Sequence, residues 1–122
     1  MAAVRYIVRD VDASVAFYVD LLGFTLERQF GPNMAIVSRD GATLWLAGPG
    51  ASASQPMPDG ARPEPGGWTR LVLTVDDLDG TVERLRVAGA RFRNEILKGP
   101  GGRQILVEDP SGNCVELFEA AV

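Results

Sequence analysis

The sequence near the C-terminus reads Asp109-Pro110-Ser111-Gly112-Asn113-Cys114-Val115-Glu116-Leu117-Phe118-Glu119. Its first part has the chemistry of a turn, because proline fixes φ, glycine tolerates positive φ and asparagine can bond to its own backbone. Residues 114–118 are predicted to form a strand, with Cys114, Glu116 and Phe118 on one face. A carboxylate in the middle of a strand must be solvated, paired or ligating. The partner of Glu116 is therefore the question that this sequence poses.

The composition indicates one domain of ordinary size, because 122 residues can bury a core without disulfides or metals. A single cysteine excludes an internal disulfide, and residues 1–5 lack the apolar run of a signal peptide, so we expect a cytoplasmic protein with no membrane association. The net charge of −4, without a basic stripe, argues against nucleic acid and weakly favours neutral or cationic small molecules. The chain has no histidine, the commonest metal ligand and acid–base group.

The predicted secondary structure is a βαβββ unit that occurs twice. In the first half, strands are predicted at residues 3–9, 24–30, 34–38 and 42–47, with a helix at 11–22. In the second half, strands are predicted at 68–75, 90–97, 103–108 and 113–118, with a helix between Asp77 and Gly89. Residues 8–10 match residues 75–77, and residues 40–46 match residues 111–117. This internal repeat indicates a tandem duplication.

Residues 48–67 are rich in Gly, Pro, Ala and Ser and are predicted to lack regular structure. A segment of about twenty such residues is unusual inside a compact domain. It is either a lid, a binding loop or a crossing between halves, or a disordered connector. We therefore expect a single domain, residues 1–122, with module one at 1–48, a linker at 49–67 and module two at 68–122.

The repeat predicts an α+β fold in which tandem βαβββ modules form a curved, partly closed, barrel-like sheet with the helices on its outer face. The inner faces would enclose a cavity, within one chain or across a dimer, and we expect a homodimer with two equivalent clefts. Side-chain alternation predicts the helix-facing residues: Val4, Tyr6, Val8, Leu44, Leu46, Leu71, Leu73, Val75, Val115 and Leu117. The same alternation predicts the cavity-facing residues: Ala3, Arg5, Ile7, Thr43, Trp45, Trp68, Arg70, Val72, Cys114, Glu116 and Phe118.

Two separated motifs stand out in the sequence. The first comprises Val8-Arg9-Asp10, Ser14, Phe17-Tyr18 and Leu22-Gly23-Phe24. The second comprises Asp109-Pro110, Gly112-Asn113 and Glu116-Leu117. Both motifs resemble the vicinal oxygen chelate superfamily, which includes glyoxalase I, extradiol dioxygenases, fosfomycin-inactivating enzymes and bleomycin resistance proteins. The resemblance covers the whole chain and implies the paired βαβββ fold.

Metal-dependent members of that superfamily hold a divalent ion with four residues on the first and last strands of the two modules. The resemblance carries these positions to Ala3, Trp45, Arg70 and Glu116. Only Glu116 can ligate a metal, since alanine and the indole offer no ligand atom and arginine stays protonated. A catalytic divalent ion needs about three protein ligands. We therefore predict a metal-independent protein without a cofactor.

The predicted ligand site has a charged part and an aromatic part. We expect Arg70 and Glu116 to form a charge-assisted pair with Arg5 nearby, which either presents hydrogen bonds to a ligand or only compensates for burial. Trp45 and Trp68 have two possible roles: they stack on a planar ligand, or they fill the cavity or lie in a dimer contact. We favour the ligand pocket for Trp45 and the dimer interface for Trp68. The remaining candidates are Met34, Met57, Cys114 and Phe118. Met34, Met57 and Phe118 each have core or loop packing as the alternative role, and Cys114 lacks a base that would activate it.

The predicted function is that of a ligand-binding protein similar to bleomycin resistance proteins, which sequesters a bulky aromatic antibiotic or metabolite and so confers drug resistance. A first alternative is a metal-independent isomerase, cyclase or lyase, with Glu116 as general base and Arg70 or Arg5 stabilising an oxyanion. A second alternative is a non-catalytic accessory protein that contacts another chain. The pattern favours binding over catalysis.

Overall fold

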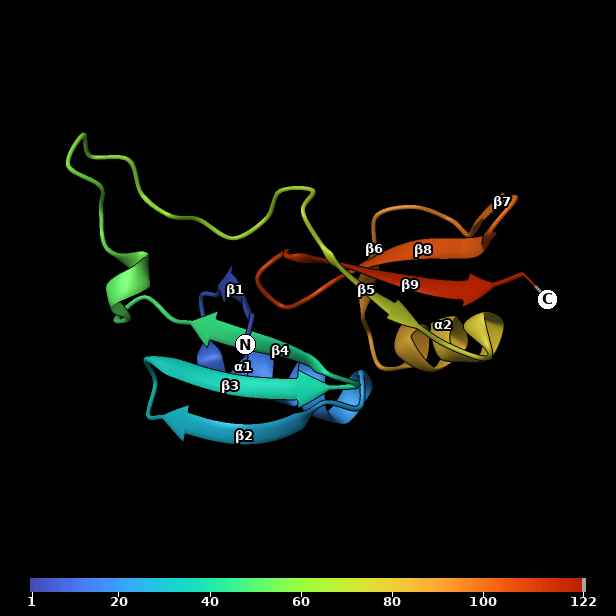
Figure 1. Cartoon of the computed structure of the whole chain (residues 1–122), viewed down its shortest axis with the longest axis horizontal. Coiled ribbons are helices and arrows are strands. Elements are labelled where there is room, and N and C mark those ends of the chain that lie inside the picture. Colours follow the sequence, from blue (N-terminus) through green and yellow to red (C-terminus); the bar gives the residue numbers. More distant parts are fainter. Residues whose placement is uncertain (122) are drawn as a thin grey trace. The chain divides into compact units, whose positions relative to one another are not determined.

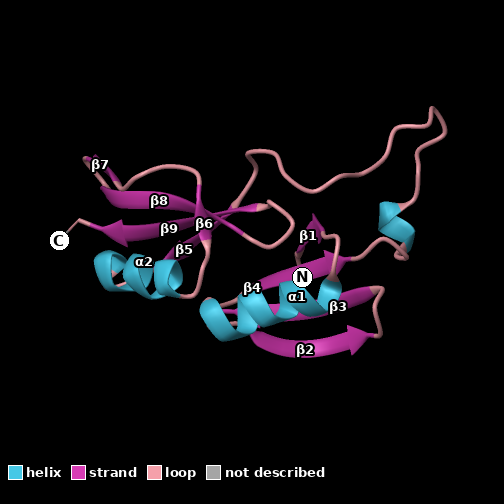
Figure 2. Ribbon diagram, turned by 180° about the vertical axis from the view of Figure 1, so that it is seen from behind, coloured by secondary structure: helices cyan, strands magenta, loops and turns pink. Residues whose placement is uncertain are grey.

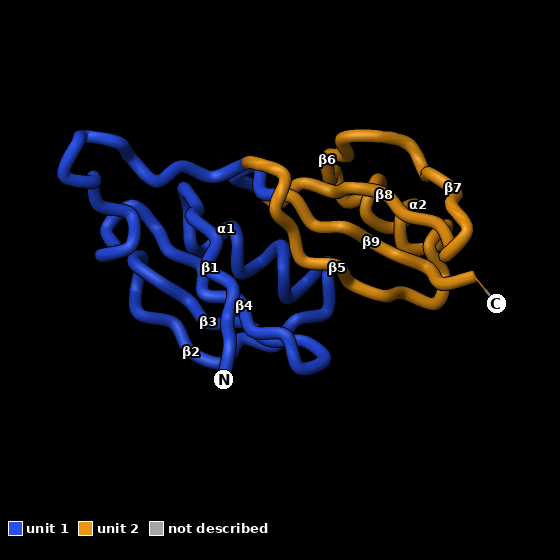
Figure 3. The backbone as a smooth tube through the Cα atoms, turned by 45° about the horizontal axis from the view of Figure 1, so that its top comes forward, with its two compact units in different colours: residues 1–66, 110–113 blue, residues 67–109, 114–122 orange. Residues whose placement is uncertain are grey.

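The computed structural model describes residues 1–121 and divides into two compact units, which Figure 3 shows in separate colours. Unit 1 contains residues 1–66 together with residues 110–113. Unit 2 contains residues 67–109 and the chain from Cys114 onward. Each unit has its own sheet and helix (Figures 1 and 2). The predicted α+β class is confirmed, with two curved sheets that each mix parallel and antiparallel pairs.

Unit 1 is a four-stranded sheet with the strand order β1-β4-β3-β2. Its elements are β1 (Val4–Ile7), α1 (Val11–Ala16), the π-helical segment η1 (Phe17–Leu21), β2 (Thr25–Phe30), β3 (Met34–Arg39), β4 (Ala42–Ala47) and the short 3-10 turn η2 (Ser52–Ser54). β1 runs parallel to β4, while the other neighbours are antiparallel. This arrangement matches the βαβββ unit expected from the sequence.

The first helix begins and ends where its capping residues require. The Asp10 side chain accepts a hydrogen bond from the Ala13 N–H at 3.0 Å, which satisfies a free backbone donor of the first turn. The helix widens into a π-helical turn from Phe17 onward, a detail that the sequence did not predict. Gly23 then adopts φ 73°, a left-handed conformation that ends the helix. The ring of Tyr18 is fully buried against Phe17 and Phe24.

Unit 2 is a five-stranded sheet with the order β5-β9-β8-β6, and β7 pairs separately with β8. Its elements are β5 (Leu71–Thr74), α2 (Leu78–Val87), β6 (Arg91–Phe92), β7 (Leu97–Gly99), β8 (Gly102–Glu108) and β9 (Cys114–Ala120). The predicted strand at 90–97 is wrong in its length, because it is broken into β6 and the start of β7. The Asn94 side chain accepts the Leu106 N–H at 3.0 Å, so a side chain takes the place of a backbone acceptor and the chain leaves the sheet.

The strand registers of the two units confirm the predicted alternation. In unit 1, β1 pairs with β4 through Val4–Leu44, Arg5–Trp45 and Tyr6–Leu46. In unit 2, β5 pairs with β9 through the equivalent pairs Leu71–Val115, Val72–Glu116 and Leu73–Leu117. Most residues predicted to face the helices are buried, including Tyr6, Val8, Leu44, Leu46, Leu73, Val115 and Leu117. Val4, at the start of β1, is 39% exposed and departs from the pattern. The core of each unit therefore lies between its helix and its sheet.

The long linker is tied to unit 1 at both ends. The Gly48 N–H donates to the Asn33 carbonyl at 2.8 Å, and the Gly66 N–H donates to the Asn113 side chain at 2.8 Å. Between these points the Met57 N–H donates to the Ala61 carbonyl at 2.7 Å, which forms a turn. The segment is thus a hydrogen-bonded loop that carries little regular structure.

The turn at residues 110–113 joins two strands of unit 2 but belongs to unit 1. The Arg9 N–H donates to the Ser111 hydroxyl at 2.8 Å, and the Arg9 guanidinium donates to the Ser111 carbonyl at 2.6 Å. The Asn113 amide donates to the Ile7 carbonyl at 2.8 Å while its oxygen accepts from Gly66. The polar residues of the Asp-Pro-Ser-Gly-Asn motif therefore bond to the end of β1 and to the end of the linker.

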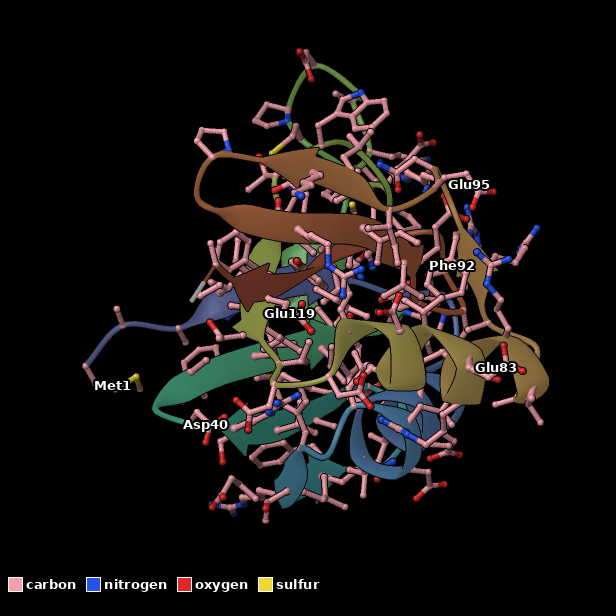
Figure 4. All side chains as sticks on the ribbon, turned by 90° about the vertical axis from the view of Figure 1, so that its right-hand side faces the viewer. Met1, Asp40, Glu83, Phe92, Glu95 and Glu119 are labelled. Atoms are coloured by element: carbon pink, nitrogen blue, oxygen red, sulfur yellow. The ribbon has the colours of Figure 1, made fainter. Side chains whose placement is uncertain are left out.

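An ion-pair network joins α2 to the ends of β8 and β9. Arg103 donates to Asp79 at 2.9 Å and to Glu119 at 2.9 Å. The Glu119 carboxylate, labelled in Figure 4, also accepts the Leu78 N–H at 2.8 Å at the first turn of α2. The hydrogen bond from this N–H and the one from Arg103 hold the pKa of Glu119 below its usual range. Arg103 likewise holds the pKa of Asp79 low.

The lowered pKa of Glu119 predicts how acid destabilises unit 2. A carboxyl group whose pKa is lower in the folded state stabilises the fold above its ordinary pKa of about 4.3, and this contribution disappears as the pH falls through the folded value. We expect Glu119→Gln to flatten the fall in stability between about pH 5 and pH 3. Urea unfolding midpoints measured across this range test it, with the exposed Glu95→Gln as the matched control. Parallel acid profiles for the parent and Glu119→Gln would contradict the assignment.

Candidate functional site

The face of the unit 1 sheet opposite α1 carries one row of side chains that crosses all four strands. Arg5 on β1 pairs with Trp45 on β4, Trp45 pairs with Ile36 on β3, and Ile36 pairs with Arg28 on β2. Directly paired residues on neighbouring strands point to the same face. These four residues, which we call the cross-strand row, therefore lie side by side with an arginine at each end.

Trp45 is the central aromatic residue of this row. The Arg5 guanidinium lies over its ring, 5.1 Å from the centroid. Its indole Nε1 atom is buried and has no hydrogen-bond partner among residues 1–121. A hollow of about 220 Å³ is lined by Met1, Ala3, Arg5 and Trp45. A buried indole donor without an acceptor is costly, so a ligand acceptor placed there would be favourable.

A second row lies next to the first on the same face of unit 1. It consists of Ile7, Ala47, Met34 and Phe30, each paired with the next across the sheet. Phe30 is 44% exposed, and the Arg28 guanidinium lies over its ring at 4.6 Å. Met34 is half-buried at the start of β3 and pairs with Ala47. The face thus combines apolar surface with guanidinium groups.

Arg70 and Glu116 form an ion pair in unit 2, as the repeat predicted. Arg70 Nε and Nη2 donate to the same oxygen, Glu116 Oε1, at 3.0 and 2.9 Å. The exposed fractions of the two side chains are 29% and 10%. The carboxylate is therefore held by a guanidinium and is largely withdrawn from water. Whether the pair also touches a ligand stays a prediction.

A second ion pair on the same unit was missed by sequence reasoning. Arg93 donates to Glu108 at 2.9 Å and to the Gly67 carbonyl at 2.7 Å. Its guanidinium also lies over the ring of Trp68 at 4.7 Å, although Trp68 remains 69% exposed. The contact depends on the pairing of β6 with β8, which brings Arg91 opposite Glu108 and Arg93 close to it, and the sequence carries no signal for this register. Trp68 is thus a surface residue of unit 2, held by an arginine.

Cys114 is fully buried on β9, next to these ion pairs. Burial raises the pKa of the Cys114 thiol, and the nearby charges of Arg93 and Arg70 offset only part of this effect. A thiol that stays protonated is a poor nucleophile. The inert role proposed for Cys114 therefore has a physical basis.

The other predicted site residues lie apart from these contacts. Met57 is in the linker of unit 1 and is 47% exposed. Phe118 is on β9, half-buried, and pairs with Thr74 on β5 and Gln104 on β8. The structure therefore groups Arg5, Met34 and Trp45 on unit 1, and it groups Arg70, Cys114 and Glu116 on unit 2.

The residues at the superfamily's metal positions do not fit a divalent ion. Glu116 is engaged by the positive Arg70, and Ala3 and Trp45 supply no metal ligand. Within residues 1–121, no group of three or more Cys, Asp or Glu side chains could hold a metal ion. No chemical step through a metal is therefore assigned to these residues.

Arg28, Phe30 and Ile36 are the residues of this face that sequence reasoning missed. The reason is a β-bulge in β2, where Leu26 pairs with Val37 and Arg28 pairs with Ile36, so that Glu27 is the extra residue. A bulge shifts the alternation of side chains by one position. Simple alternation from Thr25 would have put Arg28 on the helix side. The Ser38 hydroxyl donates to Glu27 at 2.7 Å, which fits a bulge at this point.

Paired βαβββ units of this kind define the vicinal oxygen chelate fold. The family model described as the Glyoxalase/Bleomycin resistance protein/Dioxygenase superfamily matches residues 1–117, so the chain belongs to this superfamily. No protein of curated function matches its sequence. No helix within the described residues is long and apolar enough to cross a membrane.

Three solved structures show what the chain is similar to. A member of the same superfamily from Sphaerobacter thermophilus is 27% identical, with a TM-score of 0.70 over 98% of this chain and 97% of the other. TnmS3, an antibiotic binding protein from a Streptomyces species, is 27% identical, with a TM-score of 0.68 over 99% of this chain and 97% of the other. Lactoylglutathione lyase from Agrobacterium tumefaciens is 22% identical, with a TM-score of 0.74 over 98% of this chain and 92% of the other, and this likeness concerns the fold alone.

Proposed function

We propose that the protein binds an aromatic small molecule, an antibiotic or a metabolite, on the Trp45 face of unit 1 and sequesters it without a metal ion. The observation that carries the proposal is the buried indole N–H of Trp45, which has no partner within residues 1–121 and belongs to a side chain that lines a hollow. An aromatic ligand could stack on the apolar rows and offer an acceptor to this N–H. Binding pockets commonly combine an apolar wall with a few polar groups in this way.

Two further facts support binding as the role. The positions that hold the metal ion in metal-dependent superfamily members carry residues here that do not fit a divalent ion. This chain therefore lacks the protein ligands that such an ion needs. One of the similar structures is named as an antibiotic binding protein and aligns over nearly the whole of both chains. We extend binding of this kind to this chain as a proposal, together with a role in drug resistance.

Catalysis by Glu116 has less support. A general base must be able to take a proton from its substrate, and it is most effective when its pKa lies near the working pH. Glu116 Oε1 instead accepts two hydrogen bonds from Arg70. The oxygen that accepts these two hydrogen bonds is therefore not free to accept a proton from a substrate. We therefore propose that the ion pair has a structural role in unit 2.

Truncation of Trp45 tests the proposal directly. We expect Trp45→Ala to weaken binding of the neutral probe naphthalene-2,6-dicarboxamide by about thirtyfold, because a central buried tryptophan contributes about 2 kcal/mol to a binding site. Trp45→Phe, which keeps a ring but removes the N–H, is expected to lose less. Trp68→Ala on unit 2 is the matched control and should bind like the parent. Titration calorimetry measures all four proteins.

The outcomes separate binding from catalysis and from an accessory role. Recovery of the probe unchanged after prolonged incubation supports sequestration. Equal affinities of the parent and Trp45→Ala for the probe would contradict the proposed site at Trp45. Native mass spectrometry of protein from its own cells adds the oligomeric state and any retained compound, and a stoichiometric divalent ion there would contradict the metal-independent proposal.

A further inference from the structure

The charge on the unit 1 face differs from that of the whole chain. The chain carries a net charge of −4, yet the cross-strand row has a guanidinium at each end. Neither Arg5 nor Arg28 makes an ion pair or side-chain hydrogen bond within residues 1–121, and each instead covers an aromatic ring. Other arginines are matched with carboxylates, such as Arg39 with Asp40 and Arg93 with Glu108. The row is thus a local positive site on an acidic protein.

The geometry of the row limits the shape of a ligand. Arg5 and Arg28 are separated by three interstrand spacings, so their Cα atoms are about 14 Å apart. Trp45 and Ile36 lie between them, and both are half-buried. Glu27, the acidic residue at the bulge, accepts a hydrogen bond from Ser38. The apolar centre suits a flat ring system, and the two ends suit negative groups.

We propose that the ligand of this face is a planar aromatic acid with anionic groups at its two ends, one for Arg5 and one for Arg28. The inference rests on the proposed function and names the chemical class of its ligand. A guanidinium binds a carboxylate through charge-assisted hydrogen bonds, and an arginine already lying on an aromatic ring has lost part of its side-chain freedom before binding. A cationic ligand would meet two positive groups on this face and is disfavoured.

Three probes of one shape test the charge requirement. Naphthalene-2,6-dicarboxylate has two anionic groups at opposite ends, 2-naphthoate has one, and naphthalene-2,6-dicarboxamide is neutral. We expect each carboxylate to improve affinity by about fivefold, the scale of one solvent-accessible ion pair. Raising the salt concentration from about 0.02 to about 0.5 M should weaken the dicarboxylate while leaving the dicarboxamide unchanged.

Substitution of Arg28 tests the far end of the row. Arg28→Met should reduce the affinity for the dicarboxylate to that for 2-naphthoate and leave the dicarboxamide unaffected. Arg28→Lys keeps the charge and should retain most of the difference between the probes. Arg62→Met, an exposed arginine of the linker, changes the net charge equally and is the matched control. Calorimetry gives the affinities, and circular dichroism verifies that each variant is folded.

The outcomes distinguish this inference from the proposed function. Equal affinities for the dicarboxylate and the dicarboxamide would overturn the anionic class while leaving aromatic binding at Trp45 intact. An Arg28→Met variant that keeps its full preference for the dicarboxylate would overturn the role of Arg28. If none of the three probes binds the parent protein, both the inference and the proposed function are wrong.

Discussion

Replacement of Arg70 by methionine is expected to lower the free energy of unfolding by about 3 kcal/mol. The substitution leaves Glu116, whose side chain is only 10% exposed, without the guanidinium that now donates two hydrogen bonds to it. A buried carboxylate without a partner costs several kcal/mol, or it must take up a proton. The cost arises from the uncompensated charge rather than from the loss of an attractive contact.

The double variant Arg70→Met/Glu116→Met separates these two explanations. Because replacing both partners of a buried ion pair by apolar residues is often neutral, we expect the double variant to regain most of the lost stability. Arg86→Met is the matched control, since its pair with Glu95 is longer, at 3.5 Å, and lies at exposed side chains, so a change within about 0.5 kcal/mol is expected. Urea denaturation measures the four proteins. A small effect of Arg70→Met alone would mean that Glu116 finds another partner or is hydrated.

The second large effect is expected at Asn113. Its side chain is 4% exposed and bonds to two backbone groups, the Ile7 carbonyl and the Gly66 N–H, at 2.8 Å each. Asn113→Ala removes both bonds and leaves two backbone groups without these partners. An unsatisfied buried polar group costs about 1–3 kcal/mol, so we expect a loss of at least about 2 kcal/mol in the free energy of unfolding.

Two further variants give this prediction its controls. Asn113→Asp retains an acceptor for Gly66 but no donor for Ile7, and it places a carboxylate against a carbonyl oxygen, so it should not restore stability. Asn33→Ala removes an exposed asparagine side chain of the same unit and should change stability by less than about 0.5 kcal/mol. Thermal or urea unfolding measures each protein. If Asn113→Ala were as stable as the parent, the turn would not be what holds β1 and the end of the linker.

The ion-pair variants also bear on function. If Arg70→Met/Glu116→Met folds and binds naphthalene-2,6-dicarboxamide like the parent protein, the pair is structural and the ligand site lies on unit 1. The sequence left both roles open, because an arginine and a glutamate at equivalent positions of a repeat predict proximity only. Because its hydrogen bonds are short and its side chains are little exposed, breaking the pair should give a measurable loss of stability.

Much of the fold could be predicted because its causes are local. Alternating apolar residues predicted the buried faces of β1, β4, β5 and β9, and Asp77 marked the start of the second helix, which it caps. The repeat predicted which strands are equivalent in the two units, and the registers agree with it. The break between β6 and β7 could not be predicted in this way, because it depends on the Asn94 side chain meeting the backbone of a distant strand.

Some residues of the candidate site could be predicted from the sequence, and others could not. The sequence by itself determined that Arg5, Trp45, Arg70 and Glu116 lie on the sheet faces opposite the helices, since side-chain parity along one strand needs no knowledge of its neighbours. Only the tertiary structure decided that Arg28 and Phe30 share a face with Trp45, because the bulge at Glu27 changes the parity of β2 and shows itself only in its pairing with β3. Periodicity is a property of one strand, whereas a row across four strands is a property of their register.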